Sequence, residues 1–148
     1  MKHKAKVGAV VTNIATLAEA EQVFKQLSKW SGEVVYQETI VEGVQAIVGL
    51  RNDPQFGWYV AVGLGGSLSD ALEDRAYVFL PTSPTIFARA LARTKLSTVL
   101  NVKQTEQCLK ALLALQTLAL STKNLQELEI NPLFISNSFC VVADMKCS

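Results

Sequence analysis

The sequence predicts an α+β fold in which helices pack on a mostly antiparallel sheet. Three observations predict this class: β-like runs dominate the chain, turn-forming residues separate them, and only a few segments show helical periodicity. The chain has 148 residues, of which 49% are hydrophobic, so it can bury a sizeable core. Because no repeat or linker divides it, we expect a single domain over residues 1–148.

The beginning of the chain predicts one strand followed by one helix. Residues 7–13 form a short apolar run that is typical of a buried strand. Thr16 and Glu19 have the spacing of a capping box, which opens a helix that we expect to run to about Trp30. The apolar stripe of this helix consists of Ala20, Val23, Phe24 and Leu27. We expect the helix to be structural.

Three further β-like runs follow at residues 33–39, 44–51 and 58–64. The turn-formers Glu42-Gly43 and Asn52-Asp53-Pro54 separate them, which predicts a three-stranded meander.

The next part of the chain predicts a fourth strand and two helices. The strand is expected at residues 75–80. Ser83 can then cap a helix, with Pro84 in its first turn. A second helix is expected over residues 105–120, and because its apolar residues occupy more than one face we expect it to be largely buried.

The chain ends in a predicted hairpin, with arms at residues 126–135 and 139–144, and this hairpin carries the sharpest chemical signal. Alternation places Asn131 on a polar face of the first arm, opposite residue 143 or 144 of the second. The side chain of Asp144 could then lie within about 5 Å of Asn131. An amide oxygen beside a carboxylate suits Mg²⁺, which needs only one or two protein carboxylates. The alternative is a solvated strand face with a charge at its end.

The glycines at residues 63–66 follow a predicted strand. Glycine lets backbone N–H groups approach phosphate oxygens, although a tight turn is the alternative reading. The Rossmann and Walker fingerprints are both incomplete here. Asp70 and Asp74 lie just beyond, and each could serve a metal or be a solvated turn residue.

Charge and cysteine usage exclude several classes of function. The 14 Lys+Arg nearly balance 13 Asp+Glu, so we expect no nucleic-acid partner and no polybasic attachment to a membrane. No apolar run reaches the roughly 18 residues that would span a bilayer. The one histidine, His3, cannot form a zinc cluster with the scattered Cys108, Cys140 and Cys147. An odd cysteine count is typical of a reducing compartment, and we expect a cytoplasmic protein.

Several motifs together resemble one family. Their order and spacing are similar to those of the ATP-grasp domain of NDP-forming acyl-CoA synthetases, such as the β subunits of ADP-forming acetate–CoA ligase and succinyl-CoA synthetase. The motifs are residues 3–10, 36–39, Arg-Asn-Asp-Pro-Gln-Phe-Gly at 51–57, Gly-Leu-Gly-Gly at 63–66, and Glu-Ile-Asn-Pro-Leu at 129–133 followed by Asp144. The resemblance covers nearly the whole chain. It implies an ATP-grasp lobe, with ATP or ADP held between two α+β lobes and Mg²⁺ on its phosphates.

The resemblance assigns nucleotide contacts to two segments. Gln37, Glu38 and Thr39 match the hinge whose backbone meets the adenine, with Glu38 at the acidic position. Gly65 and Gly66 belong to the glycine motif and are the candidates for approaching the phosphates.

The resemblance also implies metal ligands and a phosphate acceptor. Asn131 and Asp144 match the magnesium ligands of the family. Asp70 stands where the family usually has a glutamate on the metal side. His3 matches a His-Lys motif that is implicated in passing phosphate through a phosphohistidine.

The activity implied is that of an acid–thiol ligase: acyl-CoA, ADP and phosphate give the acid, CoA and ATP through acyl phosphate and phosphohistidine intermediates. CoA-binding and ligase domains would lie on a longer polypeptide or a partner subunit, and assembly into an oligomer is left open. The family's domain begins well before its His-Lys motif. We therefore expect a lobe truncated at its N-terminus, inactive as an isolated chain.

Three departures from the family pattern support a rival hypothesis. Asp70 replaces the usual glutamate, Val78 stands where the family commonly has an arginine, and residues 92–101 lack the glycine of an Arg-Gly loop. Losing a cation beside a triphosphate would weaken phosphoryl transfer. The alternative is a degenerate, inactive ATP-grasp module that acts as a nucleotide sensor or as a regulatory or subunit-interaction domain.

Overall fold

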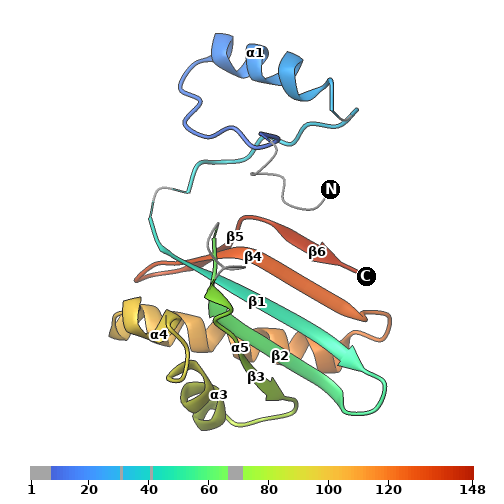
Figure 1. Cartoon of the computed structure of the whole chain (residues 1–148), viewed down its shortest axis with the longest axis vertical. Helices are drawn as coiled ribbons and strands as arrows, with labels where there is room; N and C mark the ends of the chain where they lie inside the picture. The colour runs from blue at the N-terminus through green and yellow to red at the C-terminus, as the bar shows by residue number, and fades with distance from the viewer. Residues whose placement is uncertain (1–7, 31, 41, 67–71) are drawn as a thin grey trace. The chain divides into compact units, whose positions relative to one another are not determined.

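The computed structural model describes residues 8–30, 32–40, 42–66 and 72–148. The chain divides into two compact units, Met1–Val41 and Glu42–Ser148, and each is described by itself (Figure 1).

The first unit contains one helix, α1 (Leu17–Leu27), among its described residues. The predicted capping box is confirmed: the Thr16 hydroxyl accepts the N–H of Glu19 at 3.2 Å, and the Glu19 carboxylate accepts the N–H of Thr16 at 3.1 Å. The N–H of Ala15 donates to the same carboxylate, and these backbone hydrogen bonds lower the pKa of Glu19. The helix ends at Leu27, short of the expected Trp30.

The prediction of two strands in this unit is wrong for its described residues. Neither the described part of residues 7–13 nor residues 33–39 forms a strand. Val10 is 49% and Val35 is 83% exposed, so these valines are not core residues. The physical reason is that β-branched residues favour a strand only when a neighbouring strand completes the ladder, and the described part of this unit contains none.

The second unit is built on an antiparallel sheet, which confirms the predicted fold class. Its strands are β1 (Val44–Asp53), β2 (Gly57–Leu64), β3 (Ala76–Phe79), β4 (Glu127–Ile135), β5 (Cys140–Val142) and β6 (Met145–Cys147). The strand order is β3-β2-β1-β4-β5, and β6 also pairs with β4. The predicted meander is therefore reduced to the β1–β2 hairpin, because β4 occupies the other edge of β1.

The turn between β1 and β2 forms as predicted. One carboxylate oxygen of Asp53 accepts the N–H groups of Gln55 and Phe56 at 2.8 and 2.9 Å. Gly57 closes the turn at a φ of 75°, a backbone conformation that glycine adopts without strain. The two backbone hydrogen bonds hold the pKa of Asp53 below its usual value.

Among the described residues, three helices cover one face of the sheet: α3 (Pro84–Leu91), α4 (Leu96–Val99) and α5 (Val102–Ser121) (Figure 1). The helix predicted after Ser83 is confirmed, whereas α4 was not predicted. The helix α5 begins before the expected residue 105, because Asn101 and Gln104 form a reciprocal capping box. Within the described part of the chain, no helix is long and apolar enough to span a bilayer.

The core lies between these helices and the sheet. Its fully buried members include Val48, Leu50, Val60, Val62, Phe87, Leu91, Leu96, Cys108, Leu112 and Ile135. The expectation that the long helix is largely buried is wrong: Leu112 is fully buried, but Leu118 and Leu120 are 39% and 55% exposed. The reason is that α5 lies on the outside of the unit and presents only one side to the sheet.

Candidate nucleotide and magnesium site

The strand β4 carries a bulge at Asn131 and Pro132. These two residues lie opposite a single residue of β1, Ile47, because the pairing register of the two strands shifts there. The peptide bond between Asn131 and Pro132 is cis. The buried positions of β4 before and after the bulge are Leu128, Ile130, Leu133 and Ile135. A bulge redirects side chains and is common beside functional sites, so it singles out Asn131 within an otherwise regular strand.

Asp144 lies directly opposite this bulge, between β5 and β6. The N–H of Asn131 donates to the backbone oxygen of Asp144, and the N–H of Ala143 donates to the backbone oxygen of Pro132, both at 3.1 Å. The predicted alignment of Asn131 with residue 143 or 144 is therefore confirmed. Asn131 and Asp144 are both half-buried. The second hairpin arm differs from its prediction in one respect: it is divided into two strands, and Asp144 occupies the break.

The glycine turn after β2 meets Asn131 directly. The N–H of Gly65 donates to the backbone oxygen of Gln45 at 2.8 Å, which anchors the turn to β1. The N–H of Gly66 donates to the Asn131 side-chain oxygen Oδ1 at 3.2 Å. Two features that were predicted separately, the glycine motif and the hairpin asparagine, are thus in contact in one unit.

Asp74 is a buried structural residue, which corrects its interpretation as a metal ligand or a solvated turn residue. Its side chain is in the buried class, at 7% exposure. Its carboxylate accepts the N–H of Leu64 at 2.8 Å, of Lys95 at 2.7 Å and of Leu96 at 3.0 Å. These donors come from the end of β2 and the start of α4, where the backbone N–H groups have no partner within their own element. Asp74 therefore ties the glycine turn to α4.

The other predicted ligands lie outside the described part of the second unit. His3 and Asp70 lie outside the described residues. Gln37, Glu38 and Thr39 are described, but they belong to the first unit, where they form an exposed segment outside the helix. The adenine side and the phosphate side of the predicted nucleotide site therefore fall in different units.

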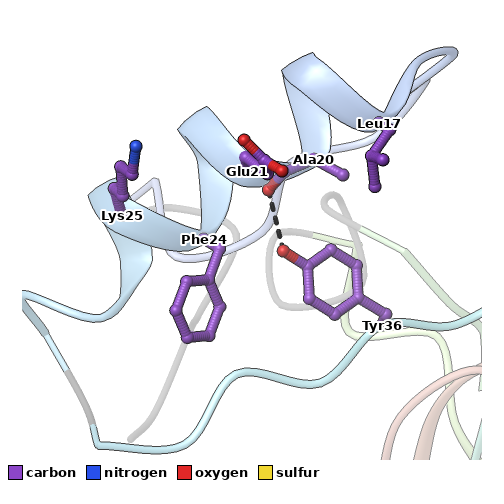
Figure 2. A pocket seen from close by; sticks show the side chains of 6 residues that line it. All are labelled: Leu17, Ala20, Glu21, Phe24, Lys25 and Tyr36. Atoms are coloured by element: carbon purple, nitrogen blue, oxygen red, sulfur yellow. Dashed lines mark hydrogen bonds between the residues drawn. The ribbon is translucent and has the colours of Figure 1, made fainter.

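The segment before Gln37 is attached to α1. The Tyr36 hydroxyl donates to the backbone oxygen of Ala20 at 2.8 Å, as Figure 2 shows. An open cavity of about 460 Å³ lies here, lined by Leu17, Ala20, Glu21, Phe24, Lys25 and Tyr36. The lining is mostly apolar, and Glu21 and Lys25 add one negative and one positive side chain to it.

Two arginines lie on the sheet face opposite the helices, and neither was predicted from the sequence as a candidate site residue. Arg51 and Arg75 line a shallow groove on this face, together with the acidic side chain of Glu127. Val78, at the family's arginine position, is 5% exposed and belongs to the core, so a side chain there points toward the helices. The sequence could have predicted this arrangement, because strand alternation places residues 75 and 77 on one face of the sheet and residue 78 on the other.

The oxygens of Asn131 and Asp144 are too few to hold a cation by themselves, but they suit Mg²⁺, which needs few protein ligands. The described residues contain no group of three or more His, Cys, Asp or Glu side chains that could hold a metal ion. They do place Asn131, which has an amide oxygen, opposite Asp144, which has a carboxylate and lies between β5 and β6. Mg²⁺ commonly takes one or two protein oxygens and completes its shell with water and phosphate oxygens.

Comparison with known proteins identifies the family. The ATP-grasp domain family matches the chain over residues 1–148. The chain is 28% identical to the ADP-forming acetate–CoA ligase II of Archaeoglobus fulgidus over 97% of its own length, and it spans 22% of that protein. It is 26% identical to the β subunit of the ADP-forming acetate–CoA ligase I of Pyrococcus furiosus, covering 97% of this chain and 68% of the subunit.

A solved structure has the same fold. It is the dinucleotide forming acetyl-coenzyme A synthetase 1 of Ca. Korarchaeum cryptofilum, in complex with coenzyme A and Mg-AMPPCP. The TM-score is 0.82 at 24% identity, covering 98% of this chain and 70% of the other. The chain belongs to the ATP-grasp domain family and is related to the ADP-forming acetate–CoA ligases.

Proposed function

We propose that this chain is the nucleotide- and magnesium-binding part of an ADP-forming acyl-CoA synthetase. The observation that carries the proposal is the contact between Gly66 and Asn131, at a strand bulge that faces Asp144. The chain spans 22% of the first relative named above, so the complete acid–thiol ligase reaction needs further parts. CoA-binding and ligase domains would supply them, on the same polypeptide or on a partner subunit.

Each candidate residue has a defined role in this proposal. Asn131 and Asp144 hold Mg²⁺ through their side-chain oxygens, with Asp70 as a third candidate ligand. The ion would neutralise charge on the nucleotide phosphates during transfer. The Gly65–Gly66 turn lies against the phosphates, because its lack of side chains allows a close approach.

The remaining assignments concern the adenine and the phosphate relay. Gln37, Glu38 and Thr39 would bind the adenine, and His3 would accept phosphate as a phosphohistidine. We propose that the protein works in the cytoplasm, where its three free cysteines would stay reduced.

Calorimetric titration with ATP, with and without Mg²⁺, tests the proposal. We expect Mg²⁺ to strengthen ATP binding to the wild type, and Asp144→Asn to abolish that effect because the metal loses its carboxylate. Asp53→Asn is the matched control, since it removes the same charge from an exposed turn at the far end of β1. An identical Mg²⁺ dependence in Asp144→Asn and the wild type would refute the metal assignment.

A nucleotide sensor without turnover is the second candidate. It is favoured by α4, which occupies the segment where the family has its glycine loop and which is hydrogen-bonded to Asp74. The full-length ligase separates the two candidates. CoA-dependent formation of ATP from acyl-CoA, ADP and phosphate supports the enzyme, whereas Mg²⁺-dependent ATP binding without any turnover supports the sensor.

A further inference from the structure

The side chain of Asn131 connects β4 to the glycine turn after β2, which is itself hydrogen-bonded to β1. It belongs to β4, its Oδ1 atom accepts the N–H of Gly66 from the turn after β2, and this turn is anchored on Gln45 of β1. Gly66 and Asn131 lie 65 residues apart in the chain. Their hydrogen bond is therefore a tertiary contact made by the fold.

A close contact at Gly65 and a positive φ at Gly66, both of which favour glycine, fix the position of the donor. A Cβ atom on Gly65 would collide with the backbone carbonyl group of Ala46, so residue 65 can lie against β1 only without a side chain. Gly66 has a φ of 83°, and a Cβ atom there would lie 2.5 Å from the side-chain oxygen of Gln45. The N–H of the preceding residue, Leu64, donates to Asp74. The peptide group between Gly65 and Gly66, which carries the donor, is thus restrained by its contacts with β1 and by this hydrogen bond of Leu64.

The chemistry of the asparagine amide gives this contact a consequence. An asparagine side chain ends in an oxygen acceptor and an NH₂ donor of similar size, and rotation about its last bond exchanges them. Only the oxygen can ligate a cation. A backbone N–H aimed at Oδ1 favours the rotamer that presents oxygen at this place, and hydrogen bonds of this kind commonly orient metal ligands.

We propose that the backbone N–H of Gly66 is a positioning group that holds the Asn131 side chain in the rotamer required for Mg²⁺ binding. The inference rests on the proposed function, because it takes Asn131 as a magnesium ligand. It assigns the glycine motif a second task besides its approach to phosphate. Disturbing the Gly65–Gly66 peptide group should weaken Mg²⁺ binding about tenfold, the lower end of the effect of losing such an orienting partner.

The test compares three glycine variants of the whole chain. Gly65→Ala pushes the donor peptide away from β1, and Gly66→Ala is a milder change that strains the same turn and keeps the test usable if the first variant does not fold. Gly57→Ala is the matched control. It also sits at a positive φ, 75°, but its added Cβ meets nothing within 4 Å, and it lies in the β1–β2 turn.

Nuclear magnetic resonance of the Asn131 side-chain NH₂ group supplies two readouts. Without metal, its signals should shift in Gly65→Ala and Gly66→Ala and stay unchanged in Gly57→Ala, which a general loss of stability would not produce. With saturating AMPPCP, a Mg²⁺ titration followed on the same signals should show weaker binding in the first two variants only.

The outcomes separate the inference from the proposed function. If folded Gly65→Ala and Gly66→Ala keep the wild-type signals and Mg²⁺ affinity, or if Gly57→Ala loses as much affinity, the positioning role is wrong while the metal site stands. If the Asn131 signals of the wild type do not respond to Mg²⁺ at all, the metal site itself is wrong and the positioning role falls with it.

Discussion

Replacing Asp74 by asparagine should destabilise the second unit strongly, although the two side chains have nearly the same shape. The carboxylate accepts three backbone N–H groups through two oxygens: Oδ1 takes that of Lys95, and Oδ2 takes those of Leu64 and Leu96. An amide offers only one oxygen. In its better orientation it keeps the pair at Leu64 and Leu96 and points its own NH₂ at the N–H of Lys95.

The magnitude follows from these three bonds. A hydrogen bond to a charged group contributes about 1.5–3 kcal/mol and a neutral one about 0.5–1.5 kcal/mol, so each of the two retained bonds loses about 1 kcal/mol. The third donor loses its partner and faces another donor, which costs a further 1–3 kcal/mol or so. We therefore expect Asp74→Asn to lower the free energy of unfolding by about 3–5 kcal/mol.

Urea unfolding followed by tryptophan fluorescence measures this loss. The chain has two tryptophans, and in a Trp30→Phe background the signal comes from Trp58 of β2, which packs against the core of the second unit. Glu73→Gln is the control, since it removes one negative charge from the exposed neighbouring residue. If Asp74→Asn costs no more than Glu73→Gln, the three hydrogen bonds do not hold the turn and α4 together.

Further predictions concern the thiols, the turn carboxylate and the long helix. Burial raises the pKa of Cys108 to about 12, so at pH 8 an alkylating reagent should label the exposed Cys147 well before it labels Cys108, and mass spectrometry showing equal rates would contradict the burial. The lowered pKa of Asp53 means that its stabilising effect is present above the ordinary aspartate pKa and is lost as pH falls through the folded value. The stability advantage of the wild type over Asp53→Asn should therefore shrink below about pH 4 in urea unfolding, and a constant difference would refute it. Leu112→Ala should cost about 2–5 kcal/mol of unfolding free energy, and Leu120→Ala far less because Leu120 is 55% exposed; equal losses would show that α5 does not pack as described.

Local signals in the sequence predicted the elements whose stability is local. The capping box at Thr16 and the Asp53 turn need only residues close in the chain, and both formed as expected. Over the described residues, the strands expected at 7–13 and 33–39 did not form, because a strand depends on a neighbour that local sequence cannot supply. The pairing of β1 with β4 is equally invisible locally, because the two strands are far apart in the chain.

The candidate site likewise has one contact that could be predicted from local sequence and one that could not. The alignment of Asn131 with Asp144 could be predicted, because both lie in one hairpin with a short turn. The contact of Asn131 with Gly66 could not, since it depends on the order of the strands in the sheet. The bulge is visible in the pattern of buried residues along β4. The buried positions change from even to odd residue numbers at Pro132, which indicates one extra residue.

The central place of β1 has a consequence for synthesis on the ribosome. Its first neighbour, β2, follows it immediately, but its second neighbour, β4, comes only after β3 and all the helices of the second unit have been translated. At about 5–20 residues per second, the apolar β1 strand waits several seconds with one edge unpaired. An unpaired edge can pair with another chain, so the nascent chain is open to aggregation during this interval. Slowing translation between β2 and β4 would lengthen it and lower the yield of folded protein.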